Sequence, residues 1–327
     1  MSSRSSPHRA PWVGAWLLIL CALVVAMILV GGATRLTDSG LSITEWDLSK
    51  GLTPPLTDAR WAEEFALYRR TTEYQVQNRG MSLAQFQHIY WWEWGHRFLG
   101  KMIGIVFAIP FLVFWTQGRL NGRFWPILGF GALGGMQGAV GWWMVVSGLE
   151  GRLDVSPIRL AVHLGLAFLI LAVGVRLAIH AFAPAPRTRP GALVWVLAGA
   201  VLVQTLLGAL MAGADAGAAF ADWPTIGGAW LPALADGPLL ENPAALQFFH
   251  RATGYAVVLI ALATAWRAPQ PLRGAATLAA ALAVAQAMLG VAVVLTGARL
   301  GLSLAHQAGA VALWIAAAAL TSGRRLR

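Results

Sequence analysis

The chain has 327 residues, of which 57% are hydrophobic and 12% are charged, and its formal net charge is +10. This composition excludes an ordinary soluble domain. Apolar stretches of about 20 residues recur along the chain, and each can cross a hydrocarbon core of about 30 Å. We therefore expect an all-α integral membrane protein with membrane lipid around it and no nucleic acid as partner. The single cysteine, Cys21, leaves no disulfide or cysteine-based metal site within one chain.

Eight transmembrane helices are expected. The first apolar run is too long for a signal peptide and no clear cleavage site follows it, so it is interpreted as a retained span. Barrel strands are excluded because the runs are too long and too continuously apolar. The spans are predicted at 12–34, 97–117, 124–146, 159–182, 191–213, 248–266, 273–296 and 302–321.

The segments between these spans alternate in charge. Arginines occur in the N-terminal tail (Arg4 and Arg9), in 117–123, in 183–190, in 267–273 and in the C-terminal tail, whereas 214–247 carries only acidic charges. Because positive residues stay in the cytoplasm, both termini are expected there. The long loops 35–95 and 214–247 then lie outside, at the periplasmic face of a bacterial inner membrane.

The chain also repeats itself. A shift of 177 positions pairs Gly31 with Gly208 and Asp38 with Asp215. Further matches are Gly40/Gly217, Trp46/Trp223, Gly51/Gly228, Pro55/Pro232, and the pattern Q-x3-G-x3-V-x-[ST]-G that begins at Gln137 and again at Gln286. This predicts two tandem, pseudo-symmetric four-helix bundles, 1–185 with the longer outer loop 35–95, and 186–327, in the same orientation.

Four of the seven histidines are predicted at the outer face, where His96 and His250 start the second and sixth spans and where His163 and His306 lie about one turn into the fourth and eighth. Each half offers two of them, on two helices, within roughly 10 Å of one depth. Two histidines that face each other across a four-helix bundle can bind a heme iron through both axial positions. A hydrogen-bonded structural role is the alternative for any single histidine. Zinc is disfavoured because it requires three or four clustered ligands.

Arginines accompany these histidines. Arg97 and Arg251 directly follow two of them, and Arg35 and Arg159 lie near the outer ends of other spans. A guanidinium group suits the carboxylate of a heme propionate, so all four are candidate propionate ligands. The alternative is that they extend to the lipid headgroups.

The two halves differ at one position. Glu93 precedes His96 by three residues, and its counterpart before His250 is Gln247. A carboxylate beside one heme can accept a proton or stabilise a developing cation, which predicts chemistry in the first half. Pairing with Arg97 is the alternative. Residues 56–95, rich in Trp and Tyr, are interpreted as two amphipathic helices at the membrane surface above this site.

Four stretches resemble the heme A synthase family of the mitochondrial and alphaproteobacterial type: GGATRLTDSGLSITEW, MSLAQFQHIYWWEWGHRFLGK, DVSPIRLAVHLGLA and FFHRATGY. The resemblance implies oxidation of the C8 methyl of heme O, through a hydroxymethyl stage, to the formyl group of heme A for cytochrome oxidase. It implies that His96 and His163 hold this substrate, that Glu93 is catalytic, and that His250 and His306 hold heme b. The chain lacks the loop cysteine pair of some bacterial members.

Two other functions stay open at this stage. One is a diheme b-type cytochrome that only exchanges electrons with quinone, and the other is an assembly factor that handles heme without converting it. The expected partners are heme O as substrate, with heme O synthase and cytochrome oxidase assembly factors as candidate protein partners. An oligomer is compatible with this composition.

Overall fold

The computed structural model describes residues 9–45, 53–182 and 188–323, and the regular secondary structure in this part of the chain is helical, with one isolated bridge between Ile226 and Ala229 in a loop. The prediction of an all-α protein is confirmed. The long helices are α1 (Pro11–Leu36), α4 (Leu83–Thr116), α5 (Phe124–Leu149), α6 (Pro157–Phe182), α7 (Ala192–Gly213), α8 (Pro243–Arg267), α9 (Gln270–Leu295) and α10 (Leu300–Leu320). Short helices are α2 (Asp58–Tyr68) and α3 (Thr72–Val76), with 3₁₀ turns at Ala216–Ala218 and Leu239–Glu241.

Seven of these helices, α1, α4 and α6 to α10, are long and apolar enough to cross a membrane. Large apolar side chains on their outer faces are exposed, among them Ile109, Leu259 and Met288, as expected for surfaces in contact with lipid. The protein is therefore an integral membrane protein. Helix α5 has the same 26 residues as α6 but is not among these seven candidate spans.

Helix α4 begins well before the predicted start of the second span at residue 97. The Ser82 hydroxyl accepts a hydrogen bond from the backbone N–H of Gln85, and the side-chain oxygen of Gln85 accepts one from the backbone N–H of Ser82, so a capping box starts the helix at Leu83. The surface segment 56–95 consequently contains α2, α3 and the first turns of α4. Residues Glu93 and His96 lie inside one continuous helix.

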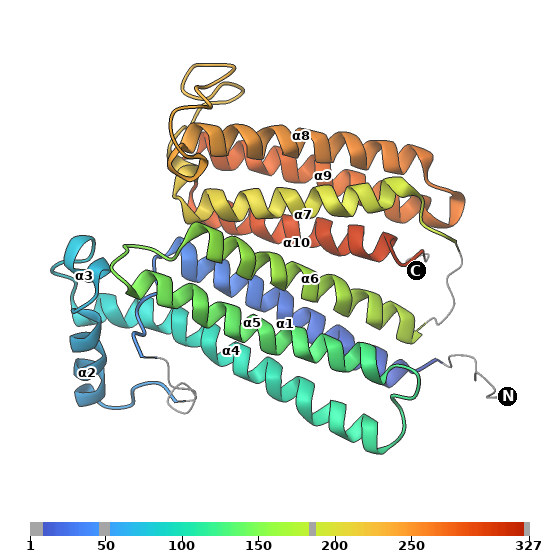
Figure 1. The fold of residues 1–327 in the computed structure, drawn as a ribbon, viewed down its shortest axis with the longest axis horizontal. Coiled ribbons are helices and arrows are strands. Elements are labelled where there is room, and N and C mark those ends of the chain that lie inside the picture. Colours follow the sequence, from blue (N-terminus) through green and yellow to red (C-terminus); the bar gives the residue numbers. More distant parts are fainter. Residues whose placement is uncertain (1–8, 46–52, 183–187, 324–327) are drawn as a thin grey trace.

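The helices form two neighbouring groups in Figure 1, with α7 to α10 in the upper part and α1, α4, α5 and α6 in the lower part. Helix α6 packs against α7 and α10, and thus joins the groups. The start of α1 and the end of α10 lie at one end of the molecule, whereas α2 and α3 lie at the other (Figure 1). The predicted boundary at 185/186 lies outside the described residues.

Two tryptophans connect helices through their indole nitrogens. Trp314 on α10 donates to the carbonyl oxygen of Phe168 on α6 at 2.6 Å, and Trp16 on α1 donates to that of Val106 on α4 at 2.8 Å. Trp314 is only 4% exposed and its ring lies 5.9 Å from the ring of Phe168. An indole N–H in an apolar interior needs an acceptor, so each bond fixes the depth of one helix against another.

We predict that Trp314→Phe lowers the thermal unfolding temperature of the purified protein in detergent. The change keeps an aromatic ring but removes one buried hydrogen bond, worth about 1 kcal/mol. Trp314→Ala should cost more, about 3–5 kcal/mol, because it also leaves a cavity. Trp12→Phe is the control, since Trp12 is 71% exposed at the start of α1. Equal unfolding temperatures for all three variants and the parent would contradict the assigned role.

Candidate functional site

A continuous cavity of about 1330 Å³ extends between the helices of both groups. Pockets for small organic ligands are usually about 300–1,000 Å³, so this cavity is larger than one such ligand requires. The cavity is lined by all four candidate histidines and by Glu93, and also by Gln247, Arg35, Arg97 and Arg251. The structure thus brings together most of the residues that the sequence singled out.

Each of the four histidine rings lies against a glycine on the helix that precedes its own. A Cβ atom placed on Gly31 would lie 2.8 Å from the Cε1 atom of His96, and one on Gly208 would lie 3.2 Å from that of His250. The other two pairs are Gly141 with His163 at 2.9 Å and Gly290 with His306 at 3.1 Å. Any side chain at these positions would move the ring, so the glycines leave room for four inward-facing imidazoles.

The histidine pair of the upper group has the spacing of two ligands on one iron. The ring centres of His250 and His306 are 6.4 Å apart, and the ring planes are inclined by 66°. An imidazole nitrogen binds a metal at about 2 Å, so two rings on opposite sides of one iron have centres roughly 6 Å apart. Among the described residues, no three His, Cys, Asp or Glu side chains gather as a metal site. Two axial histidines with a macrocycle between them fit this arrangement.

Three of the histidines also contact a glutamine one helical turn before the glycine. The amide nitrogen of each glutamine donates to the backbone carbonyl of its histidine and lies beside the ring nitrogens. The distances to Nδ1 are 3.2 Å for Gln137 and His163, 3.3 Å for Gln204 and His250, and 3.1 Å for Gln286 and His306. The sequence pattern identified Gln137 and Gln286 only as repeat positions and missed Gln204. The spacing Q-x3-G, which also occurs at Gln204 and Gly208, was the signal that could have found it.

Glu93 is 3% exposed and accepts three hydrogen bonds. Its Oε2 accepts from the Ser42 hydroxyl and from the Ile43 backbone N–H, both at 2.8 Å, and its Oε1 accepts from Arg97 at 2.6 Å. Every partner is a donor, so the site is built for a carboxylate. The ion pair with Arg97, which the sequence left as an alternative, is present beside the cavity.

Gln247 occupies the equivalent place and also accepts from an arginine, but it donates to its loop where Glu93 accepts. Its amide nitrogen donates to the backbone carbonyls of Ala216 at 2.8 Å and Phe220 at 3.3 Å, and its oxygen accepts from Arg251. A carboxylate there would face carbonyl oxygens. The loops after α1 and α7 therefore select a carboxylate in one case and an amide in the other.

Arg97 and Arg251 hold these loops in place. Arg97 donates to the carbonyls of Ile43 at 2.9 Å and Glu45 at 3.2 Å. Arg251 donates to those of Asp222 at 3.0 Å and Thr225 at 2.8 Å, and its buried Nε has no partner among the described residues. The Asp222 carboxyl accepts hydrogen bonds from the backbone N–H groups of Gly228 and Gly227 and from the Thr225 hydroxyl. These bonds keep the pKa of the Asp222 carboxyl below its usual value, so the carboxyl stays ionised in this loop.

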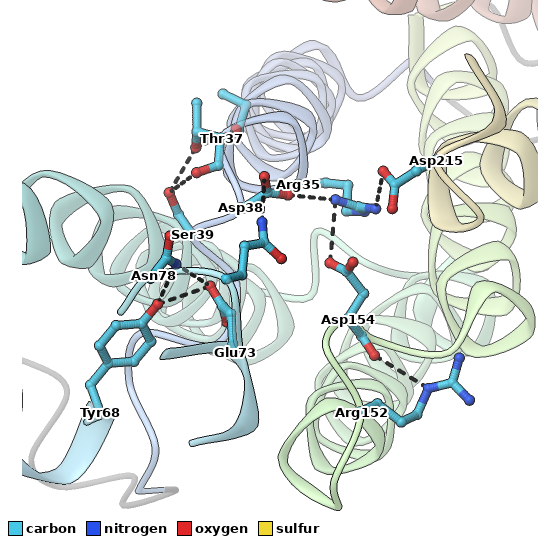
Figure 2. Close-up of polar contacts among 12 residues, drawn as sticks. Arg35, Thr37, Asp38, Ser39, Tyr68, Glu73, Asn78, Arg152, Asp154 and Asp215 are labelled. Atoms are coloured by element: carbon cyan, nitrogen blue, oxygen red, sulfur yellow. Dashed lines mark hydrogen bonds and ion pairs between the residues drawn. The ribbon is translucent and has the colours of Figure 1, made fainter. Parts of the chain in front are cut away.

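Arg35 joins three segments at the outer end of the helices (Figure 2). Its guanidinium pairs with Asp38 at 2.8 Å, with Asp215 at 2.7 Å and with Asp154 at 3.4 Å. Asp38 follows α1, Asp215 follows α7, and Asp154 lies in the α5–α6 loop, where burial raises the pKa of its carboxyl. The sequence did not predict this cluster, which links the two groups of helices.

Arg159 lies apart from the other candidates. Its guanidinium donates to the carbonyl oxygen of Trp143 at 2.6 Å and lies 4.7 Å from the centre of the Trp143 ring. It does not line the cavity. This contact anchors the start of α6 to α5.

Five aromatic side chains and one isoleucine form a buried cluster between the surface helices and the outer end of α4: Trp61, Tyr68, Tyr74, Phe86, Tyr90 and Ile89. Within it Glu73 is 3% exposed, and its Oε1 accepts from the Tyr68 hydroxyl at 3.0 Å and from Asn78 at 3.3 Å (Figure 2). Burial raises the pKa of Glu73 to about 8. The carboxyl also lines the cavity. It is a second buried acid near Glu93, and nothing in the sequence pattern distinguished it.

We predict that Glu73→Gln stabilises the protein increasingly as the pH rises. A carboxyl whose pKa is raised by folding stabilises the fold when protonated, and this stabilisation is lost between its ordinary pKa and about 8. Glutamine keeps the acceptor for Tyr68 without the charge. Thermal unfolding at pH 5 and at pH 8.5 should therefore give similar temperatures at the lower pH and a more stable variant at the higher pH. The exposed Glu63→Gln is the control, and a constant difference across pH would refute the assignment.

Comparison with known proteins agrees with this geometry. The family COX15-CtaA, described as cytochrome oxidase assembly protein, matches residues 14–318. Similar curated proteins are the heme A synthases of Maricaulis maris, 49% identical over 98% of both chains, and of Methylobacterium sp. (strain 4-46), 49% identical over 91% of this chain and 88% of the other. A third, from Chelativorans sp., is 48% identical over 92% of this chain and 87% of its own. With such identity over nearly its full length, this chain belongs to the heme A synthase family.

Proposed function

We propose that this chain binds heme O between His96 and His163 and oxidises it to heme A, with a heme b held between His250 and His306. Heme A synthase activity, an oxidoreductase reaction, follows from the family. The assignment of residues to two hemes is the proposal. The observation that carries it is the continuous cavity with two duplicated histidine pairs, in which a carboxylate accompanies one pair and an amide the other.

The cavity walls support two flat groups, one in each half. Glycines leave open space on the cavity side of α5, where a Cβ atom added to Gly134, Gly135 or Gly138 would have no neighbour within 4 Å. Heme, when bound, supplies an iron that can exchange electrons. The four histidines would hold such a group in each half of the cavity.

Glu93 lies one turn before His96 on the same face of α4, so it would lie beside a group held by that histidine. Oxidation of a methyl group releases protons, and a carboxylate held by three donors can accept one or stabilise positive charge at the carbon. Gln247 can do neither. This difference assigns the chemistry to the first half and leaves the second heme an electron-transfer or structural role.

Arg97 and Arg251 would contact heme propionates at the outer face. Both line the cavity, and the unpartnered Nε of Arg251 is a remaining donor for an anionic group. The guanidinium of Arg35 already pairs with three aspartates, although its Nε is likewise without a partner among the described residues. Arg159 lies over Trp143 and is the weakest of the four candidates.

We further propose that α5 is an eighth span and that residues 1–185 and 186–327 form tandem four-helix halves. Seven spans would leave the termini on opposite sides, but the start of α1 and the end of α10 lie at the same end in Figure 1. The α4–α5 and α8–α9 connections lie at that end in Figure 1, and Arg119, Arg123 and Arg267 are part of them or adjoin them. This favours both termini in the cytoplasm and the heme sites near the periplasmic face of the inner membrane. Heme O synthase and oxidase assembly factors are the proposed protein partners.

We predict that Glu93→Gln lowers the yield of heme A while both hemes remain bound. Glutamine can keep the contacts with Ser42 and Ile43 through its oxygen, but its NH₂ group then meets the Arg97 guanidinium, and the negative charge is lost. Hemes extracted from the purified protein and separated by mass should show heme O in excess over heme A, beside unchanged heme b. A yield equal to that of the parent would remove Glu93 from the mechanism. Heme b alone in both sites of the parent would support the electron-transfer cytochrome instead.

We also predict that Gly141→Ala weakens heme binding in the first half. The new methyl group would lie 2.9 Å from the Cε1 atom of His163, so the ring must turn away. Gly129→Ala is the matched control on the same helix, because that position is exposed and has no neighbour within 4 Å. Heme content and the low-spin absorption of each heme are the measurements. Equal loss in both variants would indicate a general effect on α5 rather than on His163.

A further inference from the structure

The four histidines are not held equally. In three cases the helix before the histidine carries a glutamine four residues ahead of the glycine, and that glutamine contacts the histidine. In α1 the corresponding residue before Gly31 is Met27. The Nδ1 atom of His96 is buried and has no hydrogen-bond partner among the residues that the structure describes. Among the four histidines, His96 therefore lacks the polar contact that the other three rings make.

The two halves differ at a second position beside this glutamine. Gln204, the counterpart of Met27, also accepts a hydrogen bond from the hydroxyl of Thr253 on α8. The counterpart of Thr253 in the first half is Leu99. Met27 and Leu99 thus replace a hydrogen-bonded pair by an apolar pair, while Gly100 and Gly254 remain glycine beside them. The substitution keeps the packing and removes only the polar contact.

Histidines that bind a metal usually hydrogen-bond through the other ring nitrogen, and loss of that partner typically weakens binding by about 10–100-fold. In the three other pairs the amide nitrogen lies beside the ring nitrogens and also donates to the backbone carbonyl of the same histidine, so the glutamine fixes the ring relative to its own helix. A ring without it is held only by packing against Gly31 and its neighbours. Such a ligand leaves its metal more often than one with a fixed orientation.

We propose that Met27 is a positioning residue that makes His96 the exchangeable axial ligand, and that Gln204 makes His250 a permanent one. The inference rests on the proposed ligation and deepens it. A substrate site must admit heme O and release heme A, whereas a resident heme must stay. The absence of a glutamine beside His96 would supply this difference within an otherwise repeated framework.

The test measures how fast carbon monoxide binds each ferrous heme in the purified protein. Carbon monoxide needs a free axial position, so its binding rate to a six-coordinate heme reports how often one histidine leaves. The first-half site is loaded with heme A, whose formyl group shifts its absorption away from that of heme b, so the two hemes are followed separately. Met27→Gln should slow binding at the first-half heme by about 10-fold or more and leave the second unchanged. Gln204→Met should accelerate binding at the second heme alone.

Met27→Leu is the matched control, because it removes the sulfur without adding an amide, and its rate should stay close to that of the parent. If Met27→Gln and Met27→Leu both bind carbon monoxide as the parent does, the proposal is overturned. Should Met27→Gln fail to fold, the Gln204→Met variant decides, and an unchanged rate at its second heme overturns the proposal. High-spin, five-coordinate spectra in the parent would instead refute the histidine pairs themselves, which is a separate failure.

Discussion

The close approach of each histidine ring to a glycine on the preceding helix is the contact on which the site depends. Ionisable side chains are costly within a bilayer unless they face the interior and find partners there. Here the glycines let neighbouring helices come close while four imidazoles turn inward, with Cε1 atoms at 2.8 to 3.2 Å from where a Cβ would stand. The same small residues leave the cavity that a flat macrocycle requires. The packing of the helices and the placement of the histidines therefore depend on the same glycines, because a methyl group at these positions would disturb both.

The internal repeat explains why the two halves share one arrangement of helices and loops, and the positions at which they differ indicate where chemistry occurs. The loops after α1 and α7 both return to the histidine helix and are held there by an arginine, Arg97 or Arg251. One loop presents the donors of Ser42 and Ile43, and the other presents backbone carbonyls. A carboxylate and an amide are therefore each the residue that their loop can satisfy. The Glu93 and Gln247 difference belongs to whole loops, so exchange of the side chains alone would not exchange the functions.

Much of this could be predicted from the sequence, because the informative residues are polar and repeat within apolar spans. The four histidines, Glu93 and its counterpart Gln247 were found from spacing alone. The start of α4 was placed too late because hydropathy marks the apolar part of a helix and not its first residue, although Ser82 and Gln85 carried the capping signal. The cluster around Arg35 could not be found in this way. Its partners come from three distant segments, and only folding brings Asp38, Asp154 and Asp215 together.

The two halves are joined near His96, the ligand that we propose to be exchangeable. Gln307, next to His306 on α10, donates to the carbonyl oxygen of Ile28 on α1 at 2.8 Å, and Ile28 adjoins Met27. At the outer end the Arg35 cluster holds α1 to the end of α7. The backbone of α1 is therefore fixed on both sides of Gly31, so movement at the first site would come from the His96 side chain and not from the helix. A rigid framework with one loosely held ligand would let product leave while the second heme keeps its place, which suits an enzyme whose substrate and cofactor are close chemical relatives.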